Sequence, residues 1–179
     1  MGNSAYTDRE LVRLITTDLE KGFRALMAQY KESVYWHIRR IVNSHNEADD
    51  ITQETFIRVF RSINRFEFRS SLATWIYRIA TNEALRYVNS HKNNTSIDSS
   101  QINIIDNDGM RYDAEEIQIE LQKAIQTLPE RQKMVFSLRY YEELGYDEIA
   151  EITNSNTQTA KANYSLAKKK ITDYLKLKF

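Results

Sequence analysis

The 179-residue chain contains no cysteine, one proline and four glycines. The absence of cysteine excludes disulfides, cysteine-ligated zinc and thiol catalysis. So few glycines and prolines leave little room for the regular turns of a sheet protein. No apolar run is long enough to cross a membrane, and the polar start "MGNSAYTDRE" is unlike a secretory signal. We therefore expect a cytoplasmic protein, without membrane insertion, that is built from helices.

Apolar residues recur at intervals of three and four, as amphipathic helices require. Such series run from Phe23 to Ile38, from Leu72 to Ala84 and from Ile117 to Leu128. Between them the stretch "HKNNTSIDSSQINIIDNDGM" has no period and is rich in Asn, Ser and Asp, which is typical of a linker. The sequence predicts an all-α protein in which two small helical domains, 8–91 and 113–177, are joined by a flexible linker, 92–112.

The net charge is zero, with 25 basic and 25 acidic residues, but the charges are unevenly distributed. Residues 1–90 carry 13 basic and 11 acidic side chains, residues 91–130 carry 3 and 8, and residues 131–179 carry 9 and 6. Six lysines and one acid fall within 155–179. A basic terminal helix suits nucleic acid, and a solvated helix face is the alternative.

The C-terminal lobe has clear helix boundaries. Pro129 suits the first turn of a helix that reaches about Tyr141, and Gly145 breaks it. A short helix, "YDEIAEI", follows. Asn154 suits the left-handed conformation of a tight turn, and Asn156 can cap a longer basic helix that starts near Thr157. This order predicts a helix-turn-helix, whose second helix enters the major groove of DNA.

That second helix should present its contact residues near its N-terminus. Gln158 and Lys161 have the best chemistry for base edges, and Lys168 and Lys169 suit phosphates. Many helical hairpins share the pattern without binding DNA, so a purely structural hairpin stays open. The candidates, all expected to be exposed, are Thr157, Gln158, Thr159, Lys161, Ala162, Ser165, Lys168 and Lys169.

In the N-terminal lobe, "ADDITQETFIRVFRSINRFEFRSSLATW" begins with acids. Asp50 and Glu54 are four apart and share a helix face with Asp49 and Gln53. Like charges at this spacing repel by a few tenths of a kcal/mol, which a basic partner would offset. The alternative is a solvated helix start that the helix dipole favours. The expected buried side of this helix consists of Ile51, Phe56, Val59, Phe60 and Ile63.

The end of the same stretch mixes rings with guanidinium groups. Phe66 and Phe68 lie in a predicted loop beside Arg65 and Arg69. Exposed rings stack on unpaired bases while arginines neutralise phosphates, so the loop could hold a base that has left the duplex. The alternative places the rings in the core, above all Phe66 and Trp75.

Two segments resemble one known family. "ADDITQETFIRVFRSINRFEFRSSLATWIYRIATNEALRYVNSHK" resembles the second conserved region of sigma-70 factors, and "LPERQKMVFSLRYYEELGYDEIAEITNSNTQTAKANYSLAKKKI" resembles the fourth. The chain has no counterpart of the first or third regions, a layout similar to the extracytoplasmic-function (ECF) group. The resemblance implies a promoter-specificity subunit of bacterial RNA polymerase, with region 2 in 8–91 and region 4 in 113–177.

The resemblance also implies partners and sites. The acids Asp49, Asp50 and Glu54, with Gln53, would dock on the β′ clamp helices of core polymerase. The helix-turn-helix would read the −35 element of promoter DNA and contact the β flap, and an anti-sigma factor is expected as a further partner. The residues expected at the −10 element are Asn64, Arg65, Phe66, Phe68, Arg69, Ser71, Trp75, Arg78, Asn82 and Arg86.

Catalytic chemistry is not expected. His37, His45 and His91 lack ligand spacing for a metal, and no glycine-rich phosphate loop or activated nucleophile accompanies the acids. We therefore predict no metal, no cofactor and no enzymatic activity.

Three departures from the family pattern affect the DNA contacts. The usual turn Leu-Gly-Ile-Ser-Val is replaced by 153–157, "TNSNT", so Ser155 stands where an apolar anchor is usual. Asn163 and Leu166 replace basic residues of the recognition helix. The helix after Trp75 ends with one arginine where relatives often have several. We expect a less well packed helix-turn-helix with fewer phosphate contacts, and weaker duplex contact after Trp75.

Two other functions remain as alternatives. An ordinary helix-turn-helix operator-binding regulator would need a dimerisation helix and would gain nothing from the acids or the Phe-rich loop. A helical adaptor would bind only protein. Binding to core polymerase separates the sigma factor from the regulator, and initiation separates it from the adaptor.

Overall fold

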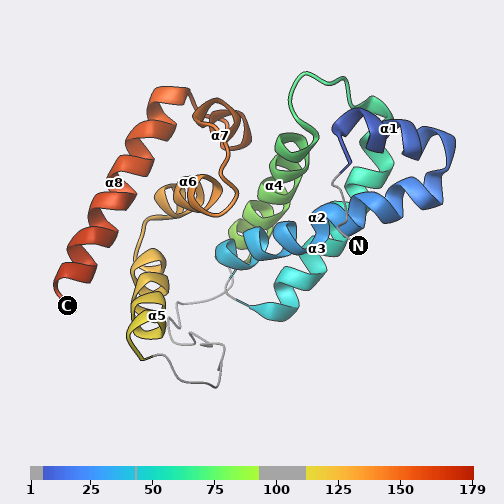
Figure 1. Ribbon diagram of the computed structural model, residues 1–179. Helices are drawn as coiled ribbons and strands as arrows, with labels where there is room; N and C mark the ends of the chain where they lie inside the picture. The colour runs from blue at the N-terminus through green and yellow to red at the C-terminus, as the bar shows by residue number, and fades with distance from the viewer. Residues whose placement is uncertain (1–5, 43, 93–111) are drawn as a thin grey trace. The chain divides into compact units, whose positions relative to one another are not determined.

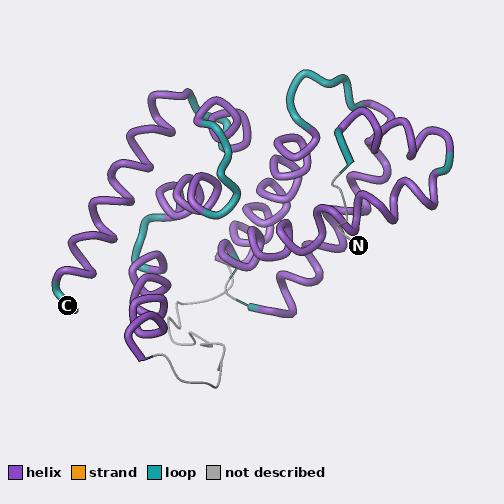
Figure 2. The backbone as a smooth tube through the Cα atoms, in the orientation of Figure 1, coloured by secondary structure: helices purple, strands orange, loops and turns teal. Residues whose placement is uncertain are grey.

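The computed structural model describes residues 6–42, 44–92 and 112–179 (Figure 1). These residues form helices and connecting loops, with no strand among them (Figure 2). The all-α prediction is therefore confirmed, whereas the predicted linker, including its "INII" stretch, lies almost wholly outside the described residues. Each helix of the described residues is too short or too polar to span a bilayer. The elements are α1 Asp8–Thr17, α2 Leu19–Ile41, α3 His45–Ser62, a 3-10 turn η1 Ile63–Arg65, α4 Leu72–Lys92, α5 Tyr112–Gln126, α6 Glu130–Tyr140, α7 Tyr146–Ile152 and α8 Thr157–Lys176.

The chain divides into two compact units, one that contains α1 to α4 and one that contains α5, α6, α8 and most of α7. In the first unit α1 packs on α2, α2 packs on α3 and α4, and α3 packs on α4. Burial of apolar side chains from all four helices supplies the main favourable free energy of this unit. Its largest fully buried apolar side chains are Leu11, Leu26, Val34, Ile38, Val59, Leu72 and Ile76.

Side-chain caps fix the starts of α1 and α2, and one glycine allows these two helices to pack closely. Thr7 forms a capping box with Glu10 at the start of α1, and Asp18 accepts from Lys21 N at the start of α2. Gly22 lies where α2 crosses α1. A Cβ at Gly22 would lie 2.7 Å from the backbone carbon of Leu14, so only glycine permits this approach.

A buried histidine lies in the core of this unit. His37 is fully buried, its Nε2 is 2.8 Å from Thr81 Oγ1, and its ring meets the Tyr77 ring edge-on at 5.2 Å. Burial, with the nearby charge of Arg40, lowers the pKa of His37 to about 3. The imidazole is therefore neutral at neutral pH and acts as a core residue.

One predicted core residue is exposed. Ile51, Phe56, Val59 and Ile63 are buried as predicted, but Phe60 is 43% exposed. Phe60 directly follows Val59, so the helical rotation carries its side chain about 100° away from the centre of the buried face. Its ring instead meets Phe23 of α2 edge-on at 5.2 Å, at the surface.

In the second unit α5 and α6 both pack on α8. Tyr141, Tyr164 and Tyr174 cover the edges of its core, and Phe136 stacks on Tyr164 at 5.8 Å. The buried apolar residues of α6 and α7 include Val135, Phe136, Leu138, Ile149, Ala150 and Ile152. One cluster of this core consists of Ala124, Ile125, Leu128, Phe136, Ala167 and Ile171.

Candidate nucleic-acid interface and acidic patch

The acidic patch, defined as Asp49, Asp50, Gln53 and Glu54, lies on the first half of α3. Asp50 and Gln53 are exposed, and Asp49 and Glu54 are half-buried. Asp49 Oδ2 is 3.4 Å from His45 Nε2, and Glu54 Oε1 is 3.1 Å from Arg58 Nε. The structure thus brings the four predicted docking residues together, with Asp50 and Gln53 presented most openly.

Glu47 anchors the start of α3 to α4. Its Oε1 accepts a hydrogen bond of 2.5 Å from Tyr87 Oη. Burial first, and then this bond to a carboxylate, raise the pKa of Tyr87 to about 12. The phenol therefore stays a hydrogen-bond donor across the physiological range and ties the start of α3, just before the acidic patch, to α4.

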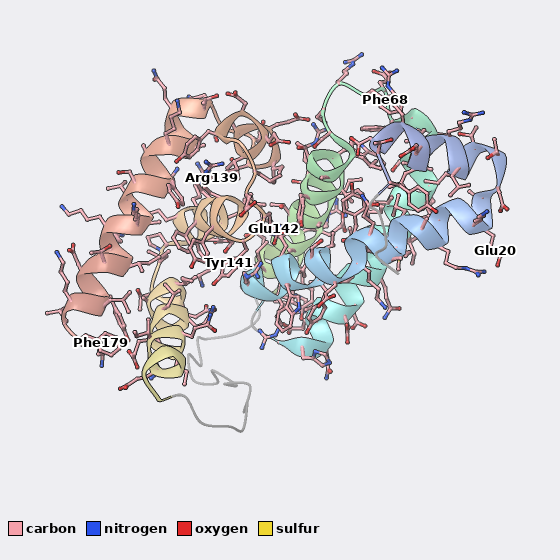
Figure 3. All side chains as sticks on the ribbon, viewed as in Figure 1. Glu20, Phe68, Arg139, Tyr141, Glu142 and Phe179 are labelled. Carbon is pink, nitrogen blue, oxygen red and sulfur yellow. The ribbon has the colours of Figure 1, made fainter. Side chains whose placement is uncertain are left out.

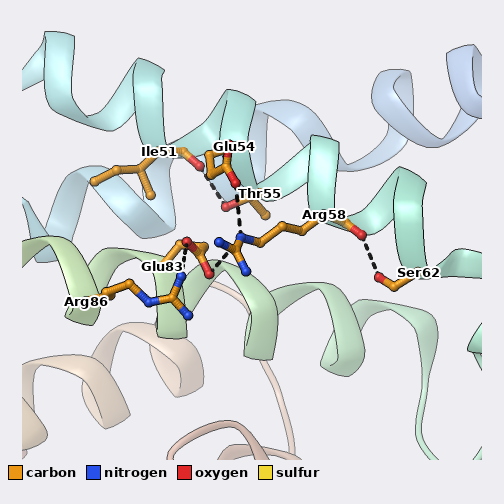
Figure 4. Close-up of polar contacts among 7 residues, drawn as sticks. All are labelled: Ile51, Glu54, Thr55, Arg58, Ser62, Glu83 and Arg86. Atoms are coloured by element: carbon orange, nitrogen blue, oxygen red, sulfur yellow. Dashed lines mark hydrogen bonds and ion pairs between the residues drawn. The ribbon is translucent and has the colours of Figure 1, made fainter.

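A line of charges runs from the acidic patch into the contact between α3 and α4 (Figure 4). Glu83 of α4 is buried, with 8% exposure. Its Oε1 is 3.0 Å from Arg58 Nε and its Oε2 is 3.2 Å from Arg86 Nη1. A buried carboxylate needs such partners, because desolvation without them is costly.

The aromatic loop, residues 66–71, joins η1 to α4. Phe66 is buried and its ring lies 4.8 Å from Phe68 and 5.4 Å from the half-buried Trp75. Phe68 is 47% exposed, on the loop that rises beyond the start of α4 (Figure 3), and has a φ of 56°. A bulky residue rarely adopts this conformation, and such strain is concentrated at binding sites. The core alternative is therefore correct for Phe66, and the ring of Phe68 is the accessible one.

Two oxygens cap the start of α4, where the aromatic loop ends. Ser71 Oγ accepts from Thr74 N at 3.1 Å, and Asp8 Oδ2 of α1 accepts from Leu72 N at 2.7 Å. The Ser71 side chain, predicted at the DNA, is thus engaged in capping. The basic residues and amides around the loop and on α4 that are exposed are Asn64, Arg65, Arg69, Arg78, Asn82 and Arg86.

The helix-turn-helix forms as predicted from α7, a tight turn and α8. Asn154 has a φ of 48°, and Ser155 N donates to Ala150 O at 2.9 Å, which is the hydrogen bond of a Schellman cap. Asn156 Oδ1 then accepts from Thr159 N at 2.7 Å and caps α8. Backbone and side-chain hydrogen bonds thus maintain this polar turn, 153–157.

The exposed face of α8 differs from the prediction at two residues. Thr157 and Thr159 are half-buried, and Thr157 Oγ1 donates to Asp147 Oδ1 of α7 at 2.6 Å. Lys161 Nζ lies 5.8 Å from the centre of the Tyr146 ring, which Arg139 also approaches at 5.1 Å. The candidates that are exposed as predicted are Gln158, Lys161, Ala162, Ser165, Lys168 and Lys169.

Three residues that shape these surfaces were not predicted from the sequence. Asp8 reaches Leu72 across 64 positions, for which no local signal exists. Glu83 is the only acid in α4, and that isolation among apolar residues, three positions before Arg86, was a usable signal. Tyr146 is predicted only as the start of a short helix, because its cationic neighbours Arg139 and Lys161 lie 7 and 15 positions away in the sequence and acids surround it locally.

Comparisons with known proteins identify the family of this chain. The family profile for sigma-70 region 2 matches residues 26–94, and that for sigma-70 region 4 matches residues 118–171. The chain is 31% identical to the ECF RNA polymerase sigma-E factor of Haemophilus influenzae, over 92% of this chain and 93% of that protein. It is 30% identical to the ECF sigma factor SigW of Bacillus subtilis, over 79% and 82%. The chain belongs to the ECF sigma factors.

Solved structures support the fold of this sigma factor. RpoE from Bartonella quintana, solved with the anti-sigma factor NepR, superposes with a TM-score of 0.72 at 21% identity, over 87% of this chain and 98% of that chain. CnrH, solved with the cytosolic domain of CnrY, gives 0.71 at 16%, over 95% and 97%. The family is non-catalytic, and its members are promoter-specificity subunits of RNA polymerase. The predicted function class is therefore confirmed, and the operator-binding alternative is set aside.

Proposed function

We propose that this sigma factor divides its contacts among three surfaces. The acidic patch docks on the β′ clamp helices of core polymerase, the aromatic loop captures the −10 element, and α8 reads the −35 element while its unit contacts the β flap. Residues 8–91 thus act as sigma region 2 and residues 113–177 as region 4, joined by a linker at 92–112.

The observation that carries the proposal is the exposed Phe68 ring on its buried aromatic base. The ring centre of Phe66 lies 4.8 Å from that of Phe68, and Phe66 in turn contacts the half-buried Trp75; exposed Arg65 and Arg69 lie near Phe68 in the chain. A base that leaves the duplex can stack on Phe68 for about 1–3 kcal/mol, which offsets unpairing. The arginines neutralise the phosphates of the displaced strand.

The exposed side chains of α4 extend this surface. Arg78 and Arg86 suit phosphates, and the Asn82 amide can donate to or accept from a base edge. Promoter opening then needs no covalent chemistry, no metal and no cofactor. The open form is favoured because flipped bases and the single strand bind better than the closed duplex does.

In α8, Gln158 and Lys161 are the candidates for base edges, and Lys168 and Lys169 for phosphates. The Asp147–Thr157 bond and the stack of Lys161 on Tyr146 hold the start of α8 in a defined position on α7. Ordered donors at the N-terminus of this helix are what major-groove reading requires.

An anti-sigma factor is proposed as a further partner. We also propose that the protein acts on polymerase as a soluble cytoplasmic factor, because its role requires this. Both solved relatives were captured with a protein of this kind or with a cytosolic domain. The same surfaces that meet polymerase and DNA would then be covered until release.

Run-off transcription with bacterial core polymerase and a library of genomic fragments tests the proposal. We expect discrete transcripts only when the sigma factor is added, and their loss with Phe68→Ala. Absence of initiation on every fragment, despite stable binding to core, would favour the adaptor. Specific binding to duplex DNA without any affinity for core would contradict the docking of the acidic patch on core polymerase.

A further inference from the structure

Glu83 is a buried acid at the contact between α3, which carries the acidic patch, and α4, which carries part of the proposed DNA surface. Its side chain is 9% exposed, and each of its two oxygens faces a different arginine. Oε1 is 3.0 Å from Arg58 Nε, and Oε2 is 3.2 Å from Arg86 Nη1. Figure 4 shows the two arginines reaching the carboxylate from α3 and from the next turn of α4.

Arg58 connects this carboxylate to the acidic patch. Its Nε–H donates to Glu54 Oε1 at 3.1 Å, and the same Nε lies 3.0 Å from Glu83 Oε1 in an ion pair, so one guanidinium lies between two carboxylates. The Arg58 side chain is itself half-covered, at 41% exposure. Glu54 therefore takes its position on α3 from a guanidinium that is fixed by Glu83.

Arg86 connects the same carboxylate to the DNA surface. Its side chain is 61% exposed, and a guanidinium has five N–H donors, so a contact with Glu83 through Nη1 leaves donors that face solvent. A long side chain loses rotamer freedom when it binds a phosphate, and a charge-assisted bond made beforehand reduces that loss.

We propose that Glu83 is a positioning residue shared by both surfaces. It holds Arg86 directly in the orientation that meets a promoter phosphate, and through Arg58 it holds Glu54 in the acidic patch. This inference rests on the proposed function, because it assigns Arg86 to DNA and Glu54 to core polymerase. The inference adds that the DNA surface and the acidic patch are energetically coupled through Glu83.

The competing explanation is that Glu83 only pins α3 to α4. In that case its loss lowers the folded fraction and weakens every activity in proportion. A positioning role changes the number of phosphate contacts, which the salt dependence of DNA binding reports independently of how much protein is active. The slope of log affinity against log salt is therefore the deciding measurement.

The experiment uses Glu83→Gln in holoenzyme on a promoter fragment obtained from the transcription library. The amide keeps the size of the side chain but lacks the charge that holds two guanidiniums. We expect the slope to become less negative by about 0.9, the value of one phosphate contact. Arg86→Ala should give the same change, and the double variant should change the slope no further than either single variant.

Glu20→Gln is the control, because Glu20 also pairs with an arginine one turn later on its own helix, Arg24, but is exposed and lies outside both surfaces. Its slope should equal that of the unmodified protein. The connection to the acidic patch is tested by core affinity. Glu54→Gln and Glu83→Gln should each weaken core binding. The double variant should weaken it by a smaller factor than the product of the two single factors.

The outcomes separate this inference from the proposed function. If Arg86→Ala lowers the slope and Glu83→Gln leaves it unchanged, the positioning role is wrong and the DNA surface stands. If Glu83→Gln acts independently of Glu54→Gln on core affinity, the connection through Arg58 is wrong. If Arg86→Ala leaves the slope unchanged, the assignment of Arg86 to DNA fails first and the inference fails with it.

Discussion

Asp8 Oδ2 accepts a hydrogen bond from the backbone N–H of Leu72 at 2.7 Å. The two residues are 64 positions apart in the chain, and the bond places an α1 carboxylate at the N-terminus of α4. The first N–H groups of a helix lack partners within it, and a negative charge there is favourable. The end of the aromatic loop is thus held by a residue from outside the loop.

Loss of this cap should affect promoter opening more than stability. We expect Asp8→Ala to cost about 1 kcal/mol of unfolding free energy, the usual value of a lost N-cap acceptor. Opening should fall further, because the aromatic loop then loses its anchor. Asp18→Ala removes a comparable acceptor at the start of α2, away from the loop. Permanganate footprinting of the −10 region should separate the two variants, and an equal loss in both would contradict the anchoring role.

Phe66 and Phe68 should respond in opposite ways to truncation. Phe66→Ala removes a buried ring, so we expect a loss of about 3–5 kcal/mol in unfolding free energy. Phe68→Ala removes an exposed ring, so stability should barely change while promoter opening is lost. Tryptophan fluorescence follows unfolding of this unit, since Trp36 and Trp75 both lie in it. Normal opening by Phe68→Ala would exclude base stacking on this ring.

Positive charge is best introduced into the acidic patch at Asp50 and Gln53. Both are exposed, whereas Glu54 is paired with Arg58, so a lysine at Glu54 would also disturb the contact with α4. We expect Asp50→Lys with Gln53→Lys to weaken core binding at least tenfold and to leave thermal unfolding unchanged. Glu20→Lys, an exposed reversal on α2, is the control for a general charge effect. Equal affinity of both variants for core would remove the docking assignment.

His37 should make stability depend on pH below neutrality. Its pKa is about 3 in the folded protein and about 6.5 when the chain unfolds, so only the unfolded chain takes up the proton between these values. Unfolding free energy should therefore fall by about 1.4 kcal/mol per pH unit below 6.5, which is about 2 kcal/mol at pH 5. Urea unfolding at pH 7.5 and pH 5.0 tests this against His37→Gln, which should lack this component. His45→Gln, at an exposed histidine, should retain it.

The turn of the helix-turn-helix should tolerate glycine and reject a β-branched residue. Asn154 has a φ of 48°, which glycine adopts freely and valine adopts at a cost of about 1–2 kcal/mol. Asn154→Gly should therefore equal or exceed the unmodified protein in stability, and Asn154→Val should weaken it. Hydrogen exchange of the α7 and α8 amides reports this unit. Matching protection in the valine variant would mean that the turn is not held in this conformation.

Local patterns were sufficient for the fold and for part of the site. The left-handed backbone at Asn154 and the N-cap at Asn156 are local preferences of single asparagines. The turn and the start of α8 were therefore predictable without any tertiary contact. Phe60 was placed wrongly because a run of apolar residues is wider than the buried face of α3. Phe66 and Phe68 could not be distinguished, because a loop has no period that tells inside from outside.

The remaining features depend on pairs of residues far apart in sequence. The Asp8–Leu72 bond and the Arg58–Glu83 bond exist only after α1, α3 and α4 have packed. Residue chemistry can nominate one partner of such a pair, as the lone acid of α4 could have done. The second partner is chosen by the packing of the helices.

The left-handed backbone at Phe68 has a consequence for the speed of promoter opening. The conformational cost of this backbone is met when the unit folds, and the Phe68 ring then rests against buried Phe66. A base captured as we propose would therefore meet a site that is already shaped, and little ordering of the protein would remain to slow its capture. The rate of strand separation should then depend on how readily the base pairs of the −10 element open, so that A·T-rich −10 elements open fastest.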